Sequence, residues 1–178
     1  IELFDRAGNR VTQWNNELHR GRTPYKTDKR GHYLHATAME IQKDYPGEFQ
    51  SYFKFSFVRN PWAQMVSLHA RLKEEHAHNR RHFERWLGRY KKYVGTIPRH
   101  TLYDRSGTLL VDFVGRHEKL NEDFREVQRR ASLPDLNLTH TNASLEINYQ
   151  DMYTDAGRAI VARAFAEDIE LYGYRFRE

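Results

Sequence analysis

Arg59 and Ser67 are the residues whose types and spacing best fit an anion-binding site. An aromatic, β-rich run over residues 52–58 predicts a buried strand, and Arg59 follows directly after it. Asn60 is a good N-cap and Pro61 suits the first position of a helix, so a helix is expected to begin there. An Arg at this point is expected at the carboxyl edge of a sheet, where open α/β folds bind ligands. Ser67 lies two helical turns beyond Asn60, about 10 Å along the same face.

An Arg and a hydroxyl in this arrangement can hold one phosphate from two sides. The guanidinium supplies paired, charge-assisted hydrogen bonds to the phosphate oxygens. The alternative is that Arg59 pairs with a carboxylate and that Ser67 is a neutral residue of the helix surface. Spacing alone leaves both interpretations open and favours the second.

The residue types around this pair resemble those of a known family. The segment Phe57-Val58-Arg59-Asn60-Pro61-Trp62, with Ser67 eight residues after the Arg, resembles the 3′-phosphate-binding segment of the Golgi-type carbohydrate sulfotransferases and their bacterial relatives. This group includes the heparan sulfate 2-O-sulfotransferases. Two further blocks follow in the family's order, Val114-Gly115-Arg116-His117-Glu118-Lys119-Leu120 with Asp123, and Ala166-Glu167-Asp168-Ile169-Glu170-Leu171-Tyr172-Gly173-Tyr174. The chain departs from the family at Gln64, where an Arg is common, and at Leu68-His69, where an aromatic residue is common.

The resemblance implies a fold, a reaction and a binding site. The fold would be α/β, with a mainly parallel sheet flanked by helices as in P-loop kinases, and the nucleotide would lie across the carboxyl ends of the strands. The reaction would be transfer of a sulfuryl group from 3′-phosphoadenylyl sulfate to a hydroxyl, with a carbohydrate as the expected acceptor, and it would need no metal. Arg59 and Ser67 would bind the 3′-phosphate of the donor. The loop that contains Thr141 and Asn142 lies where relatives fold a segment over the nucleotide.

Sulfuryl transfer also needs a base to take the proton of the acceptor hydroxyl. His35 lies 24 residues before Arg59, and its context resembles that of the His proposed as base in the 2-O-sulfotransferases. A Thr-x-x-Glu capping box that starts at Thr37 predicts a helix over 38–44, so His35 is expected in the loop just before a helix, where it can face a cleft. His32 is the nearby alternative. The alternative is that one or both histidines are loop residues whose rings hydrogen-bond to the backbone and take no part in catalysis.

One part of the family's pattern does not occur in these 178 residues. Relatives grip the phosphosulfate with a loop of the type Pro-Lys-x-Gly-Gly-Thr-Ser, which runs straight into a helix. Ile1-Glu2-Leu3-Phe4 looks like that helix. We therefore expect a single sulfotransferase domain over 1–178 that lacks its first strand and loop. A molecule that truly starts at Ile1 should bind the donor poorly.

The rest of the chain predicts alternating strands and helices, which favours an α/β fold with a mainly parallel sheet. Residues 109–114 have the second clear strand pattern. Helices are expected over 82–93, after 116–118 and over 155–171, with Gly173 closing the last one. The apolar residues expected to face the core from the helices are Trp62, Met65, Val66, Leu72, Phe83, Trp86, Leu87, Tyr90, Leu120, Phe124, Val127, Ala131, Ile160, Val161, Ala164, Phe165 and Ile169.

Composition narrows the function classes further. Hydrophobic residues make up 39% and charged residues 30% of the chain, which is typical of a folded domain. The net charge of +5 favours an anionic ligand, but no basic stripe or reading motif of a nucleic-acid binder is evident. Cysteine is absent, so disulfides and thiolate metal sites are excluded. No run of about 18 apolar residues occurs, and we expect no membrane-spanning segment within this sequence.

Two clusters of charged residues have competing interpretations. The histidines 69, 76, 78 and 82 suggest a metal site, but His-x-His in a predicted loop is more typical of a solvated surface. A basic cluster either contacts a sulfated or uronic-acid sugar or forms a solvated helix face; its members are Arg71, Lys73, Arg80, Arg81, Arg85 and Arg89.

Two other functions compete with the sulfotransferase hypothesis. One is a non-catalytic nucleotide-binding domain of the same fold, and the other is a small-molecule kinase, whose Walker-type loop does not occur in the sequence. The expected location is the cytoplasm for a bacterial protein, or the Golgi lumen for a eukaryotic one with an anchor outside this chain. The sequence leaves the acceptor, the sulfated position and the oligomeric state open.

Overall fold

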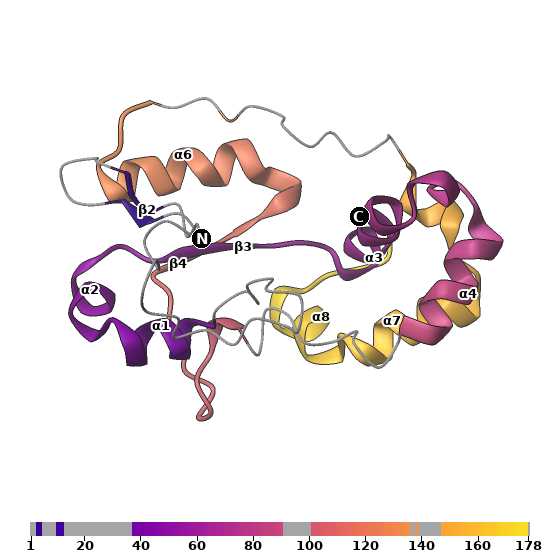
Figure 1. Cartoon of the computed structure of the whole chain (residues 1–178), viewed down its shortest axis with the longest axis horizontal. Helices are drawn as coiled ribbons and strands as arrows, with labels where there is room; N and C mark the ends of the chain where they lie inside the picture. Colours follow the sequence, from indigo (N-terminus) through magenta and orange to yellow (C-terminus); the bar gives the residue numbers. More distant parts are fainter. Residues whose placement is uncertain are drawn as a thin grey trace, which may run out of the picture. The chain divides into compact units, whose positions relative to one another are not determined.

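The structure is a computed structural model that describes residues 3–4, 10–12, 37–90, 101–135, 138 and 147–177 (Figure 1). The chain divides into two compact units, Ile1–Val58 with His100–Asn137, and Arg59–Arg99 with Leu138–Glu178. Helices and a small parallel sheet are both present, so the chain is a mixed α/β protein. A division into compact units does not decide whether those units form one domain or two. The single sulfotransferase domain expected over 1–178 therefore stays a prediction.

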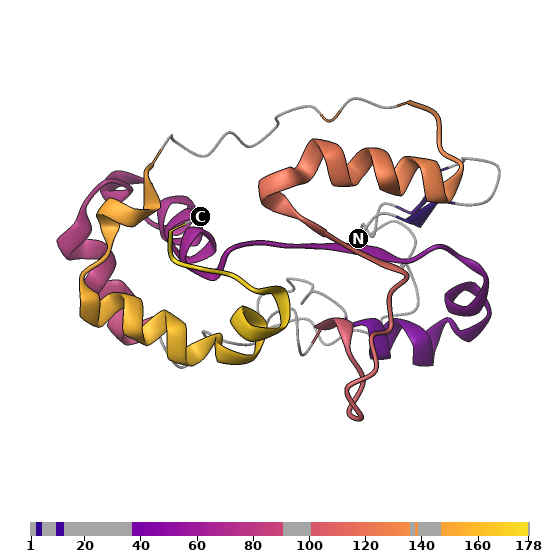
Figure 2. The ribbon, with the colours of Figure 1, turned by 180° about the vertical axis from the view of Figure 1, so that it is seen from behind.

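The first unit contains a parallel pair of strands with a helix along it. Its described elements are α1 (Ala38–Asp44), α2 (Pro46–Ser51), β3 (Phe55–Val58), β4 (Phe113–Arg116), η3 (His117–Lys119) and α6 (Leu120–Ala131). The register of the pair places Phe55 opposite Phe113 and Val58 opposite Arg116. Helix α6 lies beside β4 in both views, and its Val127 is fully buried (Figures 1 and 2). The predicted strand-then-helix order is confirmed for β4 and α6.

Strand β3 is shorter than predicted because a side chain interrupts the ladder before it. The strand begins at Phe55 rather than at residue 52. The backbone N–H of Lys54 donates to the carboxylate of Asp112 at 2.7 Å, and the Lys54 ammonium lies 2.8 Å from the same oxygen. The Lys54 carbonyl accepts from the N–H groups of Asp112 at 2.8 Å and Phe113 at 3.2 Å, whereas its own N–H is taken by a side chain, so the regular ladder starts at Phe55.

Strand β4 starts later than the predicted strand over 109–114. Leu109 instead forms an isolated antiparallel bridge with Tyr103, and the N–H of Leu110 donates to the carbonyl of Leu102. A tight turn connects these residues, in which Gly107 has φ of 91° and Asp104 accepts several hydrogen bonds from the turn. The start of the predicted strand is thus used in a local hairpin rather than in the parallel sheet.

The N-terminal expectation of a helix is wrong where the structure describes it. Strand β1 (Leu3–Phe4) pairs with strand β2 (Arg10–Thr12) in an antiparallel sheet. Gly8 and Asn9 lie between these strands in the sequence, and both residue types are typical of hairpin turns. Two short runs separated by turn-forming residues favour a hairpin over a continuous helix.

The capping box predicted at Thr37 is confirmed. The Thr37 side-chain oxygen accepts from the N–H of Glu40 at 3.2 Å, and the Glu40 carboxylate accepts from the N–H of Thr37 at 2.7 Å. Helix α1 then runs over the predicted residues and ends at Asp44, before Pro46. Its Ala38 and Ile41 are buried, so the local signal and the apolar positions agree.

The second unit is helical. Its described elements are α3 (Pro61–Leu72), η1 (Glu74–His76), α4 (Arg80–Tyr90), η4 (Tyr149–Met152), α7 (Asp155–Ala164) and α8 (Ala166–Tyr172). Helices α3 and α4 pack on each other and on α7, around the fully buried side chains of Phe83, Leu87, Val161 and Phe165. Leu72 was expected in the core but is 47% exposed, because it is the last residue of α3.

Helix boundaries in this unit differ from the predictions in two places. Helix α4 begins at Arg80, two residues early, because Asn79 caps it by accepting from the N–H of His82 at 2.9 Å. The helix predicted over 155–171 is two helices, α7 and α8, divided at Phe165. That residue has φ of −112° and ψ of 26°, outside the helical region, while its side chain is 2% exposed. The break between α7 and α8 thus lies at a residue whose side chain is buried in the core.

Candidate functional site

Asn60 satisfies the free N–H groups at the start of α3. Its side-chain oxygen accepts hydrogen bonds from the N–H groups of Trp62 at 3.1 Å and Ala63 at 3.4 Å, and its carbonyl accepts from Gln64 at 2.9 Å. Pro61 has no N–H to offer. The predicted N-cap and Pro start are confirmed. Because these donors are already used, an anion beside the start of α3 has to be bound by side chains.

Asn60 also connects α3 to the end of the chain. Its amide nitrogen donates to the carbonyl of Arg175 at 2.8 Å, across 115 residues of sequence. The Asn60 residue is 2% exposed, so both polar ends of a buried amide have partners. The sequence analysis did not find this link, because no local pattern signals a contact between residues so far apart.

Trp62 is fixed from three directions. Its indole N–H donates to the carbonyl of Arg158 at 3.2 Å, and its own carbonyl accepts from the hydroxyl of Tyr153 at 2.9 Å. The ring of Phe176 meets the indole edge to face at 5.7 Å. Burial, with a contribution from the nearby Glu84, raises the pKa of Tyr153, so its hydroxyl keeps the proton that it donates. The first turn of α3 is therefore held by both hydrogen bonds and ring packing.

Ser67 lies on the more open side of α3. Gln64, Ser67 and Arg71 follow one another at helical spacing and are half-buried or exposed. The buried side of the helix is formed by Pro61, Trp62, Met65, Val66, His69 and Ala70. In the part of the chain that the structure describes, the Ser67 hydroxyl has no hydrogen-bond partner. It is therefore available to a ligand.

Arg59 stands between the last residue of β3 and the cap of α3. It is half-buried and has interaction partners within the structure. Arg59 thus directly precedes the N-cap of α3, and Ser67 lies in the second turn of the same helix, the order that the sequence predicted. The other predicted site residues, His32, His35, Thr141 and Asn142, lie outside the described residues, and their roles stay predictions.

The second block of the family resemblance is explained by packing in the first unit. A Cβ atom on Gly115 would lie 2.5 Å from the Phe57 ring, so only glycine fits there without a shift. The carboxylate of Asp123 accepts from the N–H of Arg116 at 2.5 Å, which connects β4 to α6. These residues support the sheet, and nothing in their contacts requires a ligand.

The third block forms α8 and its C-terminal cap. Gly173 has φ of 64°, the left-handed conformation that glycine adopts without strain, and it closes the helix as predicted. The N–H of Tyr174 then donates to the carbonyl of Ile169 at 3.0 Å, and Tyr174 is 4% exposed. This cap directs the chain toward Arg175, whose carbonyl holds Asn60.

His69 lies on the buried side of α3, facing α4. It is fully buried, and its ring packs against Phe83 and Trp86 at 5.3 Å each. Its Nε2 atom lies 2.9 Å from Nδ1 of His82, and no hydrogen-bond partner for its own Nδ1 is found among the described residues. The ring of His76 stacks on His82 at 4.2 Å. Three of the predicted histidines therefore do come together.

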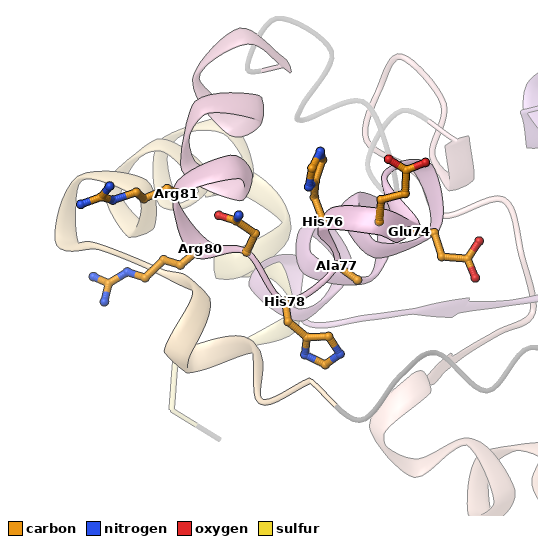
Figure 3. Close-up of a pocket in the computed structure, with 8 residues that line it drawn as sticks. Glu74, His76, Ala77, His78, Arg80 and Arg81 are labelled. Atoms are coloured by element: carbon orange, nitrogen blue, oxygen red, sulfur yellow. The ribbon is translucent and has the colours of Figure 1, made fainter.

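A shallow hollow of about 540 Å³ lies along η1 and the start of α4, with His76 of this cluster in its lining. Its lining includes Glu74, His76, His78, Arg80 and Arg81, and Figure 3 shows their side chains pointing in different directions rather than toward one point. The carboxylates of Glu74 and Glu75 lie at one end of the lining segment, and the guanidinium groups of Arg80 and Arg81 lie at the other. The arrangement indicates a solvated surface rather than a site for a small anion.

No group of three or more His, Cys, Asp or Glu side chains among the described residues is arranged to hold a metal ion. No described helix has both the length and the apolar character needed to cross a membrane.

Comparisons with known proteins give one relative. Neither a protein-family model nor a solved structure matches the chain. A protein of Archaeoglobus fulgidus, described as an uncharacterized protein, is 30% identical over 103 residues. The match covers 57% of this chain and 86% of the archaeal protein. With most of that protein's length covered at this identity, the chain belongs to the same family as the Archaeoglobus fulgidus protein.

Proposed function

We propose that this chain is part of a sulfotransferase that uses 3′-phosphoadenylyl sulfate as donor. The observation that carries the proposal is the start of α3, where Arg59, the Asn60 cap and Pro61 lead to a Ser67 hydroxyl on the open side of the same helix. The N–H groups of Trp62 and Ala63 already donate to the Asn60 side chain. A phosphate at the start of α3 would therefore have to be recognised by side chains. An Arg and a Ser are suited to that task.

The 3′-phosphate is the group that these two side chains would recognise. A phosphate dianion accepts paired hydrogen bonds from a guanidinium, and a hydroxyl donates one more from the other side. Hydrogen bonds to a charged group contribute about 1.5–3 kcal/mol each. The predicted result is a strong preference for a nucleotide with a 3′-phosphate over one without it.

In the proposed reaction, an oxygen of the acceptor hydroxyl attacks the sulfur of the donor. The new O–S bond forms while the bond between sulfur and the bridging phosphate oxygen breaks, and adenosine 3′,5′-bisphosphate leaves with the electron pair. His35 takes the proton of the hydroxyl as general base, with His32 as the alternative. The reaction needs no metal or redox step, because charge on the leaving phosphate can be stabilised by cationic side chains.

The proposal also includes the finer fold and the remaining contacts. The parallel β3–β4 pair is compatible with a P-loop-kinase-like sheet, of which it would form a part. Thr141 and Asn142 are proposed to close over the nucleotide. The acceptor is proposed to be a carbohydrate hydroxyl, the acceptor class of the family that the Arg59 segment resembles.

A transfer assay tests the proposal in the full protein that contains this chain. Sulfate-labelled donor is incubated with a panel of mono- and oligosaccharides, and labelled sugar is separated and counted. Transfer that is inhibited by adenosine 3′,5′-bisphosphate supports the enzyme. Nucleotide binding without transfer to any acceptor supports a non-catalytic binding domain instead, and a lack of both contradicts the proposal.

A further inference from the structure

We infer that the C-terminal segment, residues 174–177, acts as a strap that positions Arg59 for recognition of the 3′-phosphate. Asn60 and Phe176 are its positioning residues. The inference rests on the proposed function, because it concerns what orients the phosphate-binding side chains rather than what they bind. It is carried by contacts within the second unit alone.

The strap is fixed at two consecutive carbonyl groups. The amide of Asn60 donates to the carbonyl of Arg175 at 2.8 Å. The hydroxyl of Tyr149 donates to the carbonyl of Phe176 at 2.6 Å, and the amide of Gln150 approaches the same oxygen at 3.5 Å. Side chains from the cap of α3 and from η4 therefore hold the backbone of residues 175 and 176.

The Phe176 ring joins three elements of the unit. It meets Trp62 of α3, Tyr149 of η4 and Tyr153 edge to face, with ring centres 5.6 to 5.7 Å apart. The guanidinium of Arg158, from α7, lies 4.4 Å from its centre. One side chain at the end of the sequence thus packs against the first turn of the helix that follows Arg59. Both views show the C-terminus beside α3 (Figures 1 and 2).

The position of Arg59 depends on these contacts because it directly precedes Asn60. The Asn60 amide is fixed at both ends, by the N–H groups of α3 and by the Arg175 carbonyl. Loss of the second bond leaves the helix cap in place but frees the backbone that carries Arg59. A long side chain magnifies a small backbone shift at its tip, and paired hydrogen bonds to phosphate tolerate little displacement.

Two conservative variants separate the strap from the helix cap. Asn60→Ser keeps an oxygen that can cap α3 but removes the amide donor to Arg175. Tyr149→Phe removes the hydroxyl that holds the Phe176 carbonyl and keeps the ring, so it loosens the strap at a carbonyl other than the one that Asn60 holds. Tyr52→Phe is the matched control, since its hydroxyl has no hydrogen-bond partner among the described residues.

The measured quantity is the ratio of dissociation constants for AMP and adenosine 3′,5′-bisphosphate, obtained by calorimetry on the full protein. We expect Asn60→Ser to lower this ratio about tenfold, which corresponds to the loss of one hydrogen bond. Tyr149→Phe should lower it about threefold, which corresponds to the loss of part of one. AMP affinity should stay unchanged in both variants, and Tyr52→Phe should leave the ratio at its original value.

The outcomes distinguish the strap from the proposed function. A starting protein that binds both nucleotides equally contradicts the proposed function, and the strap inference falls with it. A starting protein that prefers the bisphosphate, together with two variants that keep the full preference, overturns only the strap. Equal losses for both nucleotides, accompanied by a lower melting temperature, would show a general structural role and would also overturn it.

Discussion

The Nε2 atom of His69 lies 2.9 Å from the Nδ1 atom of His82, at the packing surface between α3 and α4. One ring must donate and the other must accept in this contact, so protonating both rings would bring two N–H groups face to face. Burial lowers the pKa of His69 from 6.5 to about 4, and His82, His76 and Lys73 act in the same direction. Burial, together with His76, Arg85, Lys73 and Arg89, also lowers the pKa of His82.

We predict that the protein loses stability as the pH falls from about 6.5 to about 4. In this range the unfolded chain binds a proton at residue 69 that the folded chain does not, so unfolding is favoured by acid. Each pH unit within the range removes up to about 1.4 kcal/mol from the free energy of unfolding. Urea denaturation at a series of pH values measures the slope.

His69→Phe should flatten this pH dependence, because it replaces the buried imidazole with a ring that has no proton to bind. His78→Ala is the control, since that histidine is exposed and should leave the slope unchanged. An unaltered slope in His69→Phe would show that other groups cause the acid sensitivity.

Gly115→Ala should destabilise the first unit by about 1–3 kcal/mol, the usual cost of overpacking. The added Cβ would lie 2.5 Å from the Phe57 ring and 3.0 Å from the Cβ of Asp123. Gly47→Ala, in α2 of the same unit, is the matched control, because a Cβ there meets no atom within 4 Å. That variant should be neutral or stabilising by up to about 1 kcal/mol. Thermal unfolding of the two proteins tests the contrast, and equal effects would contradict the assigned packing at Gly115.

His35→Ala in the full protein should lower the rate of sulfate transfer while nucleotide affinity stays nearly constant. General base catalysis contributes typically 10²–10⁴-fold, and the base contacts the acceptor rather than the donor. Turnover and a binding titration are measured side by side, with His32→Ala as the comparison. Full activity in His35→Ala would remove its role, and a large loss in His32→Ala alone would assign the base to His32. Lost nucleotide binding in His35→Ala would indicate a structural histidine.

The sequence predicted those parts of the fold that depend on neighbouring residues. The capping box at Thr37, the Asn60 and Pro61 start of α3 and the Gly173 cap of α8 are all confirmed, because each is a short-range hydrogen-bonding or backbone preference. Burial of Phe83 and Leu87 followed from helical spacing. The same kind of local signal placed Arg59 between a strand and the cap of a helix, and Ser67 within that helix.

Features that depend on distant residues were not predicted. The start of β3 depends on the contact between Lys54 and Asp112, which are 58 residues apart. The bond from Asn60 to the Arg175 carbonyl and the pairing of His69 with His82 likewise arise only when helices pack. Sequence periodicity carries no information on such partners, so the support of the candidate site could only be found in the structure.

Recognition of a 3′-phosphate by Arg59 can be measured by a calorimetric comparison of adenosine 3′,5′-bisphosphate with AMP. We predict that the bisphosphate binds roughly ten- to hundredfold more tightly, and that Arg59→Ala removes most of this difference, since a hydrogen bond to a charged group contributes about 1.5–3 kcal/mol. Arg81→Ala, which removes the same charge from an exposed position on α4, should keep the preference. Equal affinity for the two nucleotides, or an unchanged preference in Arg59→Ala, would contradict the claim.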